Sequence, residues 1–473
     1  MDYLHWIFFI LYMTLAVAAI VTILLDNRQP AKTMAWVLVL IFLPLVGIVL
    51  YFFFGQNVRK ERAISQQRLD QLSKRSMLEF AEQRKLEVPS PYQRLVKLFA
   101  NQDPALPFQR NEAQLYLDGY AFFPQLLRDI AAARNHIHLD FFIIEDDPLG
   151  NLIADALIAK ASEGVEVRVI HDDVGCWKVP SRFFERMREG GVEVHPFMPV
   201  RFPAFTSKAN YRNHRKIAVF DGSVGYVGGM NIALRYVKGF GHQAWRDTMV
   251  RIHGNAVYAL QCAFLVDWFF VDRTLITDRR YYPEFPLPDK VCLAQVVTSS
   301  PIDPWPKIEQ GYVTILHGAR QYVYIETPYF MPTEPVLFAL RTAALSGVDV
   351  RLMLPLKADS RLVAWASRSF VKEIKDAGVK VLLYNAGFNH SKLLVSDDNL
   401  ATIGSTNVDF RSFEHDFESN VFFYNREMAL RVKQVFLDDE AQCIPHEQYH
   451  DAASQSLILR LWESLVRLLS PLM

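Results

Sequence analysis

Two short motifs in this sequence combine residue types that act on phosphate. Both read His-x-Lys-x4-Asp, and in both a Gly-Gly/Ser-x-Asn segment begins fourteen residues after the histidine. An imidazole can attack phosphorus or carry a proton, and ammonium and amide groups can bind the equatorial oxygens of a pentavalent phosphorus. Because packing needs no such repeated pair, the motifs predict a phosphate-transfer site. Their positions are His214, Lys216, Asp221 and Asn231 in the first copy and His390, Lys392, Asp397 and Asn407 in the second.

The spacing inside each motif predicts how the side chains are presented. Residues at i and i+2 of a strand project from one face, so the histidine and lysine should lie side by side. A turn and a second strand should then return the asparagine to the same point. Two imidazoles that meet across a pseudo-twofold axis can divide the work, one attacking phosphorus while the other protonates the leaving oxygen. Since no residues with metal-ligand spacing accompany the motifs, we expect neither a metal nor another cofactor.

The motifs lie in two halves of the chain that repeat about 180 residues apart. Each matched block reads as a helix, a glycine stop and a β-branched strand. This alternation predicts an α/β fold with two pseudo-twofold-related lobes, whose mixed but mainly parallel sheets are flanked by helices. The matched blocks are 133–142 with 319–328, 164–169 with 347–352, and 183–194 with 370–381.

Most of the apolar excess lies in the first sixty residues. Residues 3–25 carry no charge and no proline, and residues 34–54 form a second uncharged run that contains Pro44 and Gly47. Runs of this length predict a transmembrane helical hairpin; the alternative is a cleaved signal peptide followed by a buried helix. The basic residues at 59, 60 and 62 outnumber those of the hairpin loop, which favours a cytoplasmic body.

Composition limits the remaining function classes. Hydrophobic residues make up 51% of the chain, which excludes a disordered protein. Lys+Arg and Asp+Glu both total 51, so a global basic footprint for nucleic acid is missing. Four scattered cysteines favour a reducing compartment. The expected domains are a membrane hairpin (1–56), charged linker helices (57–110), a first lobe (111–285), a second lobe (286–450) and an amphipathic C-terminal helix (451–473) that lies at a membrane interface or packs on the body.

The motifs and the segments around them resemble the phospholipase D superfamily and, within it, the bacterial cardiolipin synthases. The likeness covers nearly the whole chain and includes the membrane hairpin, which a soluble nuclease of the superfamily would lack. The segments that carry it are 211–217, 228–233, 245–248, 327–332 and 407–412.

The resemblance assigns a role to each motif residue. The two histidines are the catalytic pair, with His214 as the nucleophile. The lysines and asparagines bind the substrate phosphate. The two aspartates complete the catalytic motifs, and the resemblance implies a structural role for them at the turn out of the strand. The histidine-orienting carboxylates are Asp247 and Glu418, located downstream of the motifs, with Asp416 and Glu414 as rivals of Glu418.

The resemblance also implies a reaction and a location. We expect a phosphatidyltransferase that converts two phosphatidylglycerol molecules into cardiolipin and glycerol through a phosphatidyl-histidine. It would be a multi-pass protein of the bacterial inner membrane, with the bilayer and no nucleic acid as its partner, and with homodimer formation left open. The alternatives are a phospholipase D or phosphatidyltransferase with another acceptor (water, an ethanolamine or a serine headgroup) and a membrane-tethered nuclease. The two copies differ at Gly229 and Ser405, which suggests that the histidines are not equivalent.

Overall fold

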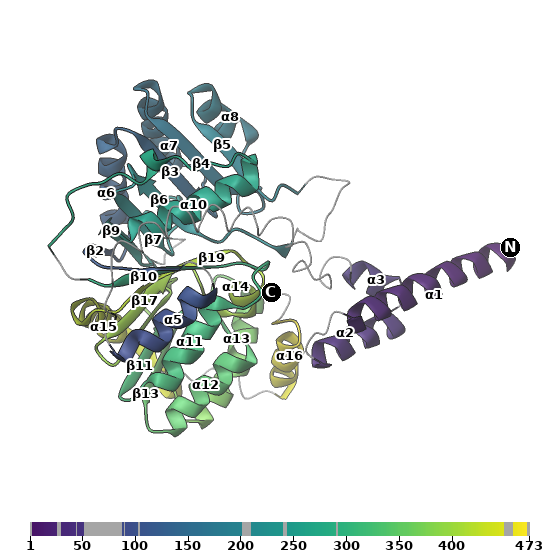
Figure 1. Ribbon diagram of the computed structural model, residues 1–473. Coiled ribbons are helices and arrows are strands. Elements are labelled where there is room, and N and C mark those ends of the chain that lie inside the picture. The colour runs from purple at the N-terminus through teal and green to yellow at the C-terminus, as the bar shows by residue number, and fades with distance from the viewer. Residues whose placement is uncertain are drawn as a thin grey trace. The chain divides into compact units, whose positions relative to one another are not determined.

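The computed structural model describes residues 2–25, 30–43, 45–51, 88, 90–102, 105–200, 210–239, 244–289, 292–448 and 457–470. The chain divides into two compact units. One contains the N-terminal helices, and the other contains both lobes of the body. Figure 1 shows the two lobes of the body, one around the sheet that contains β3 and the other around the sheet that contains β11.

The N-terminal unit contains one long apolar helix followed by two shorter helices. Within the described residues, His5–Leu25 is the one helix segment long and apolar enough to cross a membrane. Tyr12 donates a hydrogen bond to the carbonyl of Leu40 (2.8 Å), so the helices form a hairpin. The second apolar run does not form one continuous helix. One helix ends at Phe42 and the next begins at Val46, after Leu45, which has a φ of 64°. Residues 52–54 of the expected second span lie outside the described residues. The helices are α1 (Asp2–Leu25), α2 (Pro30–Phe42) and α3 (Val46–Leu50).

The first lobe is built on a seven-stranded sheet covered by helices. Its strand order is β2-β9-β7-β6-β3-β4-β5. The strands are β2 (Asn111–Tyr116), β3 (His136–Phe141), β4 (Glu166–Asp172), β5 (Glu193–Phe197), β6 (Lys216–Phe220), β7 (Val224–Gly228) and β9 (Met249–Gly254), with β8 (Ala244–Arg246) outside the sheet. The helices are α6 (Gly119–Ala132), α7 (Pro148–Ser162), α8 (Ser181–Glu189), α9 (Arg235–Lys238) and α10 (Val257–Asp272), followed by a 3₁₀ turn at Arg279–Tyr281.

The second lobe repeats this plan around a nine-stranded sheet, in the order β1-β10-β19-β17-β16-β11-β13-β14-β20. Its strands are β1 (Pro107–Phe108), β10 (Ala294–Ser299), β11 (Tyr322–Glu326), β13 (Asp349–Pro355), β14 (Lys380–Tyr384), β16 (Leu393–Ser396), β17 (Leu400–Gly404), β19 (Glu418–Phe423) and β20 (Cys443–Pro445), and the short strands β12 (Phe330–Met331), β15 (Gly387–Asn389) and β18 (Val408–Asp409) lie outside it. The helices are α5 (Gln93–Gln102), α11 (Lys307–Gly318), α12 (Glu334–Leu345), α13 (Arg361–Asp376), α14 (Phe410–Glu414), α15 (Arg426–Glu440) and α16 (Leu457–Arg467), with 3₁₀ turns at Ser90–Tyr92 and His446–Gln448.

Both sheets are mixed, but the expectation that they are mainly parallel is wrong. In each of the two large sheets the parallel pairs are confined to three strands, β3-β4-β5 and β11-β13-β14. The strand that follows each motif histidine instead forms an antiparallel hairpin, β6–β7 or β16–β17. A hairpin needs only a tight turn, whereas a parallel neighbour needs a helical crossover. The predicted turn and returning strand are therefore confirmed, and they account for the antiparallel part of the sheets.

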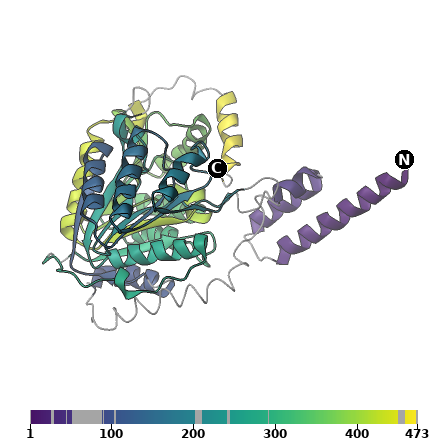
Figure 2. The ribbon, with the colours of Figure 1, turned by 90° about the horizontal axis from the view of Figure 1, so that it is seen from above.

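The two lobes share one apolar core, to which strands of both sheets and helices α10 and α15 contribute. Figure 2, viewed along a direction 90° from that of Figure 1, shows helices on both sides of the layered strands. Residues 93–102 and 105–108, which the sequence assigns to a charged linker, belong to the second lobe. Phe99 is fully buried against Phe422 (ring centroids 4.7 Å apart), and β1 pairs with β10. Residues 57–87, 89, 103 and 104 of that expected linker lie outside the described residues.

Candidate active site

Each motif histidine follows a short segment that pairs with the opposite lobe. Strand β15, which ends one residue before His390, runs parallel to β8 of the first lobe. In the first lobe, Asn213 forms the equivalent parallel bridge to Phe417. The backbone N–H of His214 donates to the carbonyl of Phe417 (2.9 Å), and that of His390 donates to the carbonyl of Arg246 (2.7 Å). The two halves therefore exchange the same contact twice, as a pseudo-twofold arrangement requires.

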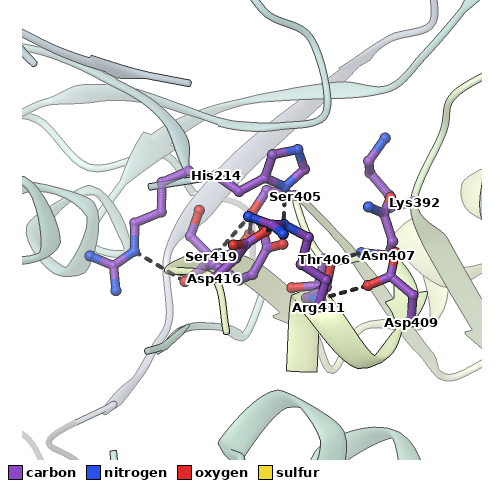
Figure 3. A network of polar contacts seen from close by, with 12 residues as sticks. His214, Lys392, Ser405, Thr406, Asn407, Asp409, Arg411, Asp416 and Ser419 are labelled. Carbon is purple, nitrogen blue, oxygen red and sulfur yellow. Dashed lines mark hydrogen bonds and ion pairs between the residues drawn. The ribbon is translucent and has the colours of Figure 1, made fainter. Parts of the chain in front are cut away.

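The histidine side chains also contact the opposite lobe. Nδ1 of His214 lies 3.0 Å from Oε1 of Glu418, and Nδ1 of His390 lies 2.7 Å from Oδ2 of Asp247. Figure 3 shows the His214 ring over the Ser405 to Ser419 part of the second lobe. The family resemblance implies the two carboxylates but not this exchange, in which each carboxylate binds the histidine of the other copy. Because the carboxylates occupy Nδ1, they leave Nε2 of each ring to meet a substrate.

The two lysines begin the strands that leave the site. Lys216 is the first residue of β6, and Lys392 directly precedes β16. Nζ of Lys392 lies 2.8 Å from Nδ1 of His390, and each lysine donates to the backbone carbonyl of the histidine two residues before it. Each is also close enough to the histidine of the other lobe to lower its pKa. Both histidines and both lysines therefore share one site.

Burial sets the charge of this site when no substrate is bound. It lowers the pKa of Lys216 to about 7 and that of Lys392 to about 8. Burial and the adjacent lysine charges lower the pKa of His390 to about 4 and hold the pKa of His214 well below its ordinary value. Both imidazoles are therefore neutral near pH 7. An anionic phosphodiester would offset the lysine charges and make protonation of a histidine easier.

The two carboxylates differ in charge. Burial raises the pKa of Glu418 to about 7. For Asp247, burial also acts to raise the pKa, but the charges and hydrogen bonds of Lys392 and His390 outweigh it and leave the pKa lowered. Asp247 therefore stays ionised near neutral pH, whereas Glu418 titrates there.

The difference between Gly229 and Ser405 belongs to this asymmetry. A Cβ at position 229 would lie 2.1 Å from Oδ1 of Asp247, so only glycine leaves room for that carboxylate. At the equivalent position of the second lobe, the hydroxyl of Ser405 donates a hydrogen bond to Glu418. Asp247 therefore packs directly against the backbone of Gly229, whereas Glu418 is held by a hydrogen bond from the Ser405 side chain.

The predicted phosphate-binding asparagines are both buried beside the motifs. In the Asn231 side chain, Oδ1 accepts a hydrogen bond from the backbone N–H of Ile143 (3.0 Å), and Nδ2 donates to the hydroxyl of Tyr236 (2.8 Å). The Tyr236 ring lies 6.3 Å from that of His390. In the second lobe, Oδ1 of Asn407 is buried and has no hydrogen-bond partner within the described residues.

Aromatic side chains surround the two imidazoles unequally. His390 lies among several rings, and His214 makes an edge contact with one, Phe142 (centroids 5.1 Å apart). These rings give the site apolar walls, most of them on the His390 side. The rings near His390 are Trp245 at 5.5 Å, Phe388 at 5.8 Å, Tyr329 at 6.2 Å and Tyr236 at 6.3 Å.

The two motif aspartates lie at the other ends of their strands, away from the histidines. Asp221 accepts hydrogen bonds from the backbone N–H groups of residues 134, 135 and 136 at 2.7–2.9 Å. Asp397 does the same for residues 320, 321 and 322 at 2.8–3.0 Å. Both residues have positive φ angles, 49° and 52°, at the hairpin turn. These contacts support the structural role implied by the resemblance and not a direct part in the chemistry.

The rivals of Glu418 do not replace it. Asp416 pairs with Arg411 (3.2 Å) and not with a histidine. Glu414 is the last residue of α14, whereas Oε1 of Glu418 lies 3.0 Å from Nδ1 of His214. Glu418 therefore is the carboxylate at His214.

Sequence reasoning missed a second layer of support. The Asn213 amide donates to Asp140 (2.8 Å), and its carbonyl accepts from the N–H of Arg215 (3.2 Å). Asn389 binds Glu326 (3.1 Å) and the N–H of residue 391 (2.9 Å) in the same way. Each asparagine side chain therefore connects a carboxylate to the backbone N–H of the residue that follows its histidine. The signal was present, because the repeat aligns Asp140 with Glu326 and Asn213 with Asn389.

Two duplicated lobes that each supply a histidine, a lysine and an asparagine to one buried site define a protein of the phospholipase D superfamily. The crystal structure of phosphatidylserine synthase from Haemophilus influenzae has the same fold, with a TM-score of 0.61 and 13% identity, and the match covers 80% of this chain and 100% of that one.

Comparison with known sequences is more specific. A family model described as cardiolipin synthase, PLD-like domain, matches residues 126–268 and 312–439, and one described as phospholipase D-nuclease N-terminal matches residues 14–56. A cardiolipin synthase of Listeria monocytogenes is 37% identical over 470 residues, covering 96% of both chains. Cardiolipin synthase 2 of Bacillus cereus is 40% identical over 463 residues, covering 95% of this chain and 88% of that protein. This chain therefore belongs to the cardiolipin synthase family.

Proposed function

We propose that this protein transfers a phosphatidyl group from one phosphatidylglycerol to another and releases cardiolipin and glycerol. The observation that carries the proposal is the pair of exchanged histidine–carboxylate contacts, His214 with Glu418 and His390 with Asp247. They bring two oriented imidazoles and two lysines into one buried site. The similarity to cardiolipin synthases over almost the whole chain supports this choice of substrate.

In the first step, Nε2 of His214 attacks the phosphorus of one phosphatidylglycerol. The bond from phosphorus to the glycerol oxygen breaks, and His390, protonated in the substrate complex, gives its proton to that oxygen. A phosphatidyl-histidine remains. The lysines and asparagines of the motifs bind the equatorial oxygens and stabilise the negative charge of the transition state.

In the second step, the headgroup hydroxyl of another phosphatidylglycerol enters. His390 takes its proton while the oxygen attacks phosphorus, and the phosphorus–nitrogen bond to His214 breaks. One phosphodiester replaces another, so the reaction is close to thermoneutral and needs no nucleotide. The aromatic rings around His390 disfavour water as the acceptor.

The charge difference between the carboxylates supports this division of work. Asp247, which stays ionised, stabilises the imidazolium that forms on His390 in each cycle. Glu418 has a raised pKa and is less able to stabilise a free imidazolium at His214. His390 therefore suits the acid–base role and His214 the nucleophilic one.

We also propose that the chain crosses the membrane twice and keeps its body in the cytoplasm. Helix α1 has the length and composition of a span, and α2 with α3 would form the second. Protease treatment of sealed inside-out vesicles should digest the body, whereas right-side-out vesicles should protect it. The reverse pattern would contradict the orientation.

Product analysis tests the reaction. Purified full-length protein supplied with labelled phosphatidylglycerol alone should form cardiolipin and glycerol in equal amounts, and added glycerol should reverse the reaction. Phosphatidic acid as the main product would indicate a phospholipase D that uses water. No glycerol release, combined with salt-dependent retention of DNA, would favour a nuclease.

A further inference from the structure

The C-terminal helix α16 binds the body through its charged side. Arg368 pairs with Glu463 (2.8 Å), and Arg467 pairs with Glu373 (2.9 Å). Between these pairs, Val466 is 2% exposed. The ion pairs and the buried valine all connect α16 to α13, so this side of the helix is fixed.

The opposite side of α16 is aliphatic and faces outward. A helix on the surface of a soluble protein normally turns its charged residues to water and its apolar residues to the core. Here the charged residues Glu463 and Arg467 face the body, and leucines three and four residues apart occupy the outer face. Their exposed fractions are 82% for Leu457, 79% for Ile458, 63% for Leu461, 49% for Leu465 and 74% for Leu468.

The direction of α16 relates this face to the active site. The contacts between the two helices follow the same order in both: Trp365 with Trp462, then Arg368 with Glu463, then Glu373 with Arg467. Helix α16 therefore runs parallel to α13. The segment that leads into α13 contains Asp359, which accepts a hydrogen bond from Tyr329 (2.6 Å). The Tyr329 ring lies 6.2 Å from that of His390. The first turn of α16 is therefore at the end of α13 that adjoins the active site.

We propose that the outer face of α16 inserts into the surface of a phospholipid bilayer and holds the second-lobe side of the active site against the lipids. Hydrocarbon fits this face because its large exposed side chains are mainly aliphatic. A bilayer is available to the chain, since α1 can span one. The inference takes its lipid partner from the proposed function.

Depth-dependent quenching tests the insertion in full-length protein reconstituted into vesicles of phosphatidylglycerol and phosphatidylethanolamine. A nitrobenzoxadiazole label is attached to Leu461→Cys in a Cys443→Ser background, because the other three cysteines are buried. The matched control is Leu345→Cys. Leu345 is 73% exposed and is the last residue of α12, next to the start of β13, which is the end of that strand away from the active site. Doxyl-labelled lipids should quench the label at 461 several-fold more than the label at 345.

Equal quenching at the two positions would overturn the proposal. A blue shift at 461 that grows with protein density but is insensitive to doxyl lipids would also overturn it, and would indicate that a second copy of the chain covers the face. Because quenching needs no turnover, a failure of the proposed reaction would leave this result unaffected.

An activity comparison provides a second readout. The variant Leu461→Glu/Leu465→Glu should form cardiolipin at least tenfold more slowly in vesicles, yet match the parent protein in detergent micelles and in thermal unfolding. The control Phe338→Glu/Leu345→Glu, with equal added charge on exposed positions of α12, should match the parent protein in both settings. Equal rates of the two variants in vesicles would contradict the proposal.

Discussion

Oε1 of Glu418, on the second lobe, lies 3.0 Å from Nδ1 of His214, on the first. The reciprocal contact joins Asp247 of the first lobe to His390 of the second at 2.7 Å. Neither lobe therefore contains a complete histidine–carboxylate pair by itself. Because correct docking of the lobes is needed to orient either imidazole, catalysis depends on the shared core as well as on the motifs.

Asp247→Asn and Glu418→Gln should lower kcat to different extents. Each amide preserves shape but removes the charge that fixes and stabilises the imidazole, a change that costs roughly 10²–10⁴-fold in comparable pairs. The larger loss should follow Asp247→Asn, because Asp247 is ionised near pH 7 and Glu418 is only partly so. Steady-state rates in mixed micelles measure this. Equal losses would contradict the assigned asymmetry.

The kcat/KM of the free enzyme should follow a narrow bell with its maximum near pH 7. Burial raises the pKa of Glu418 to about 7, so below that pH it is protonated and no longer supports His214. Burial lowers the pKa of Lys216 to about 7 and of Lys392 to about 8, so the two cations proposed to bind phosphate are lost in turn as the pH rises above 7. Glu418→Gln should remove the acid limb and keep the alkaline one. An unchanged acid limb in that variant would assign the limb to another group.

Exchanging the residues at 229 and 405 should produce unequal effects. Gly229→Ser places a Cβ against Asp247 and should reduce activity about as much as loss of that carboxylate. Ser405→Gly removes a hydrogen bond that lowers the pKa of Glu418, so it should shift the acid limb to higher pH and reduce activity less. Rate–pH profiles of the two variants, with circular dichroism as the folding control, provide the measurement. A shift to lower pH in Ser405→Gly would contradict the role given to this contact.

Asp221→Ala and Asp397→Ala should lower the free energy of unfolding and leave the kcat of the folded protein unchanged. Each removes an acceptor of three backbone N–H groups and places alanine at a positive φ, at a combined cost of roughly 2–4 kcal/mol in the free energy of unfolding. The matched Asp→Asn variants tolerate this φ and keep one acceptor oxygen, so their loss should be smaller. Thermal unfolding and kcat of the folded fraction separate the two effects. A large fall in kcat at unchanged stability would return these aspartates to the catalytic set.

The duplicated motifs predicted the two-lobed fold and the hairpin after each histidine, and the family resemblance implied both orienting carboxylates. They did not predict the exchange, because Asp247 follows His214 at a distance that equally suits contact within one lobe. Only the packing of the lobes decides between the two arrangements. The placement of Phe99 and β1 in the second lobe is likewise a long-range contact that local patterns do not contain. Asp140 and Glu326 were visible as repeat partners, but their hydrogen bonds to asparagines depend on strand register.

The central claim is that His214 attacks phosphorus and His390 acts as the general acid and base. Both His214→Ala and His390→Ala should lose nearly all turnover, and a variant that keeps a tenth of the activity would exclude its assigned role. The most direct measurement is to incubate the parent protein and both variants with phosphatidylglycerol labelled in the phosphate, quench under alkaline conditions that preserve phosphoramidates, and map the labelled peptide. The label should reside on His214 in the parent protein and be absent from His214→Ala. A label on His390 or on another residue, or no label under conditions of active turnover, would contradict it.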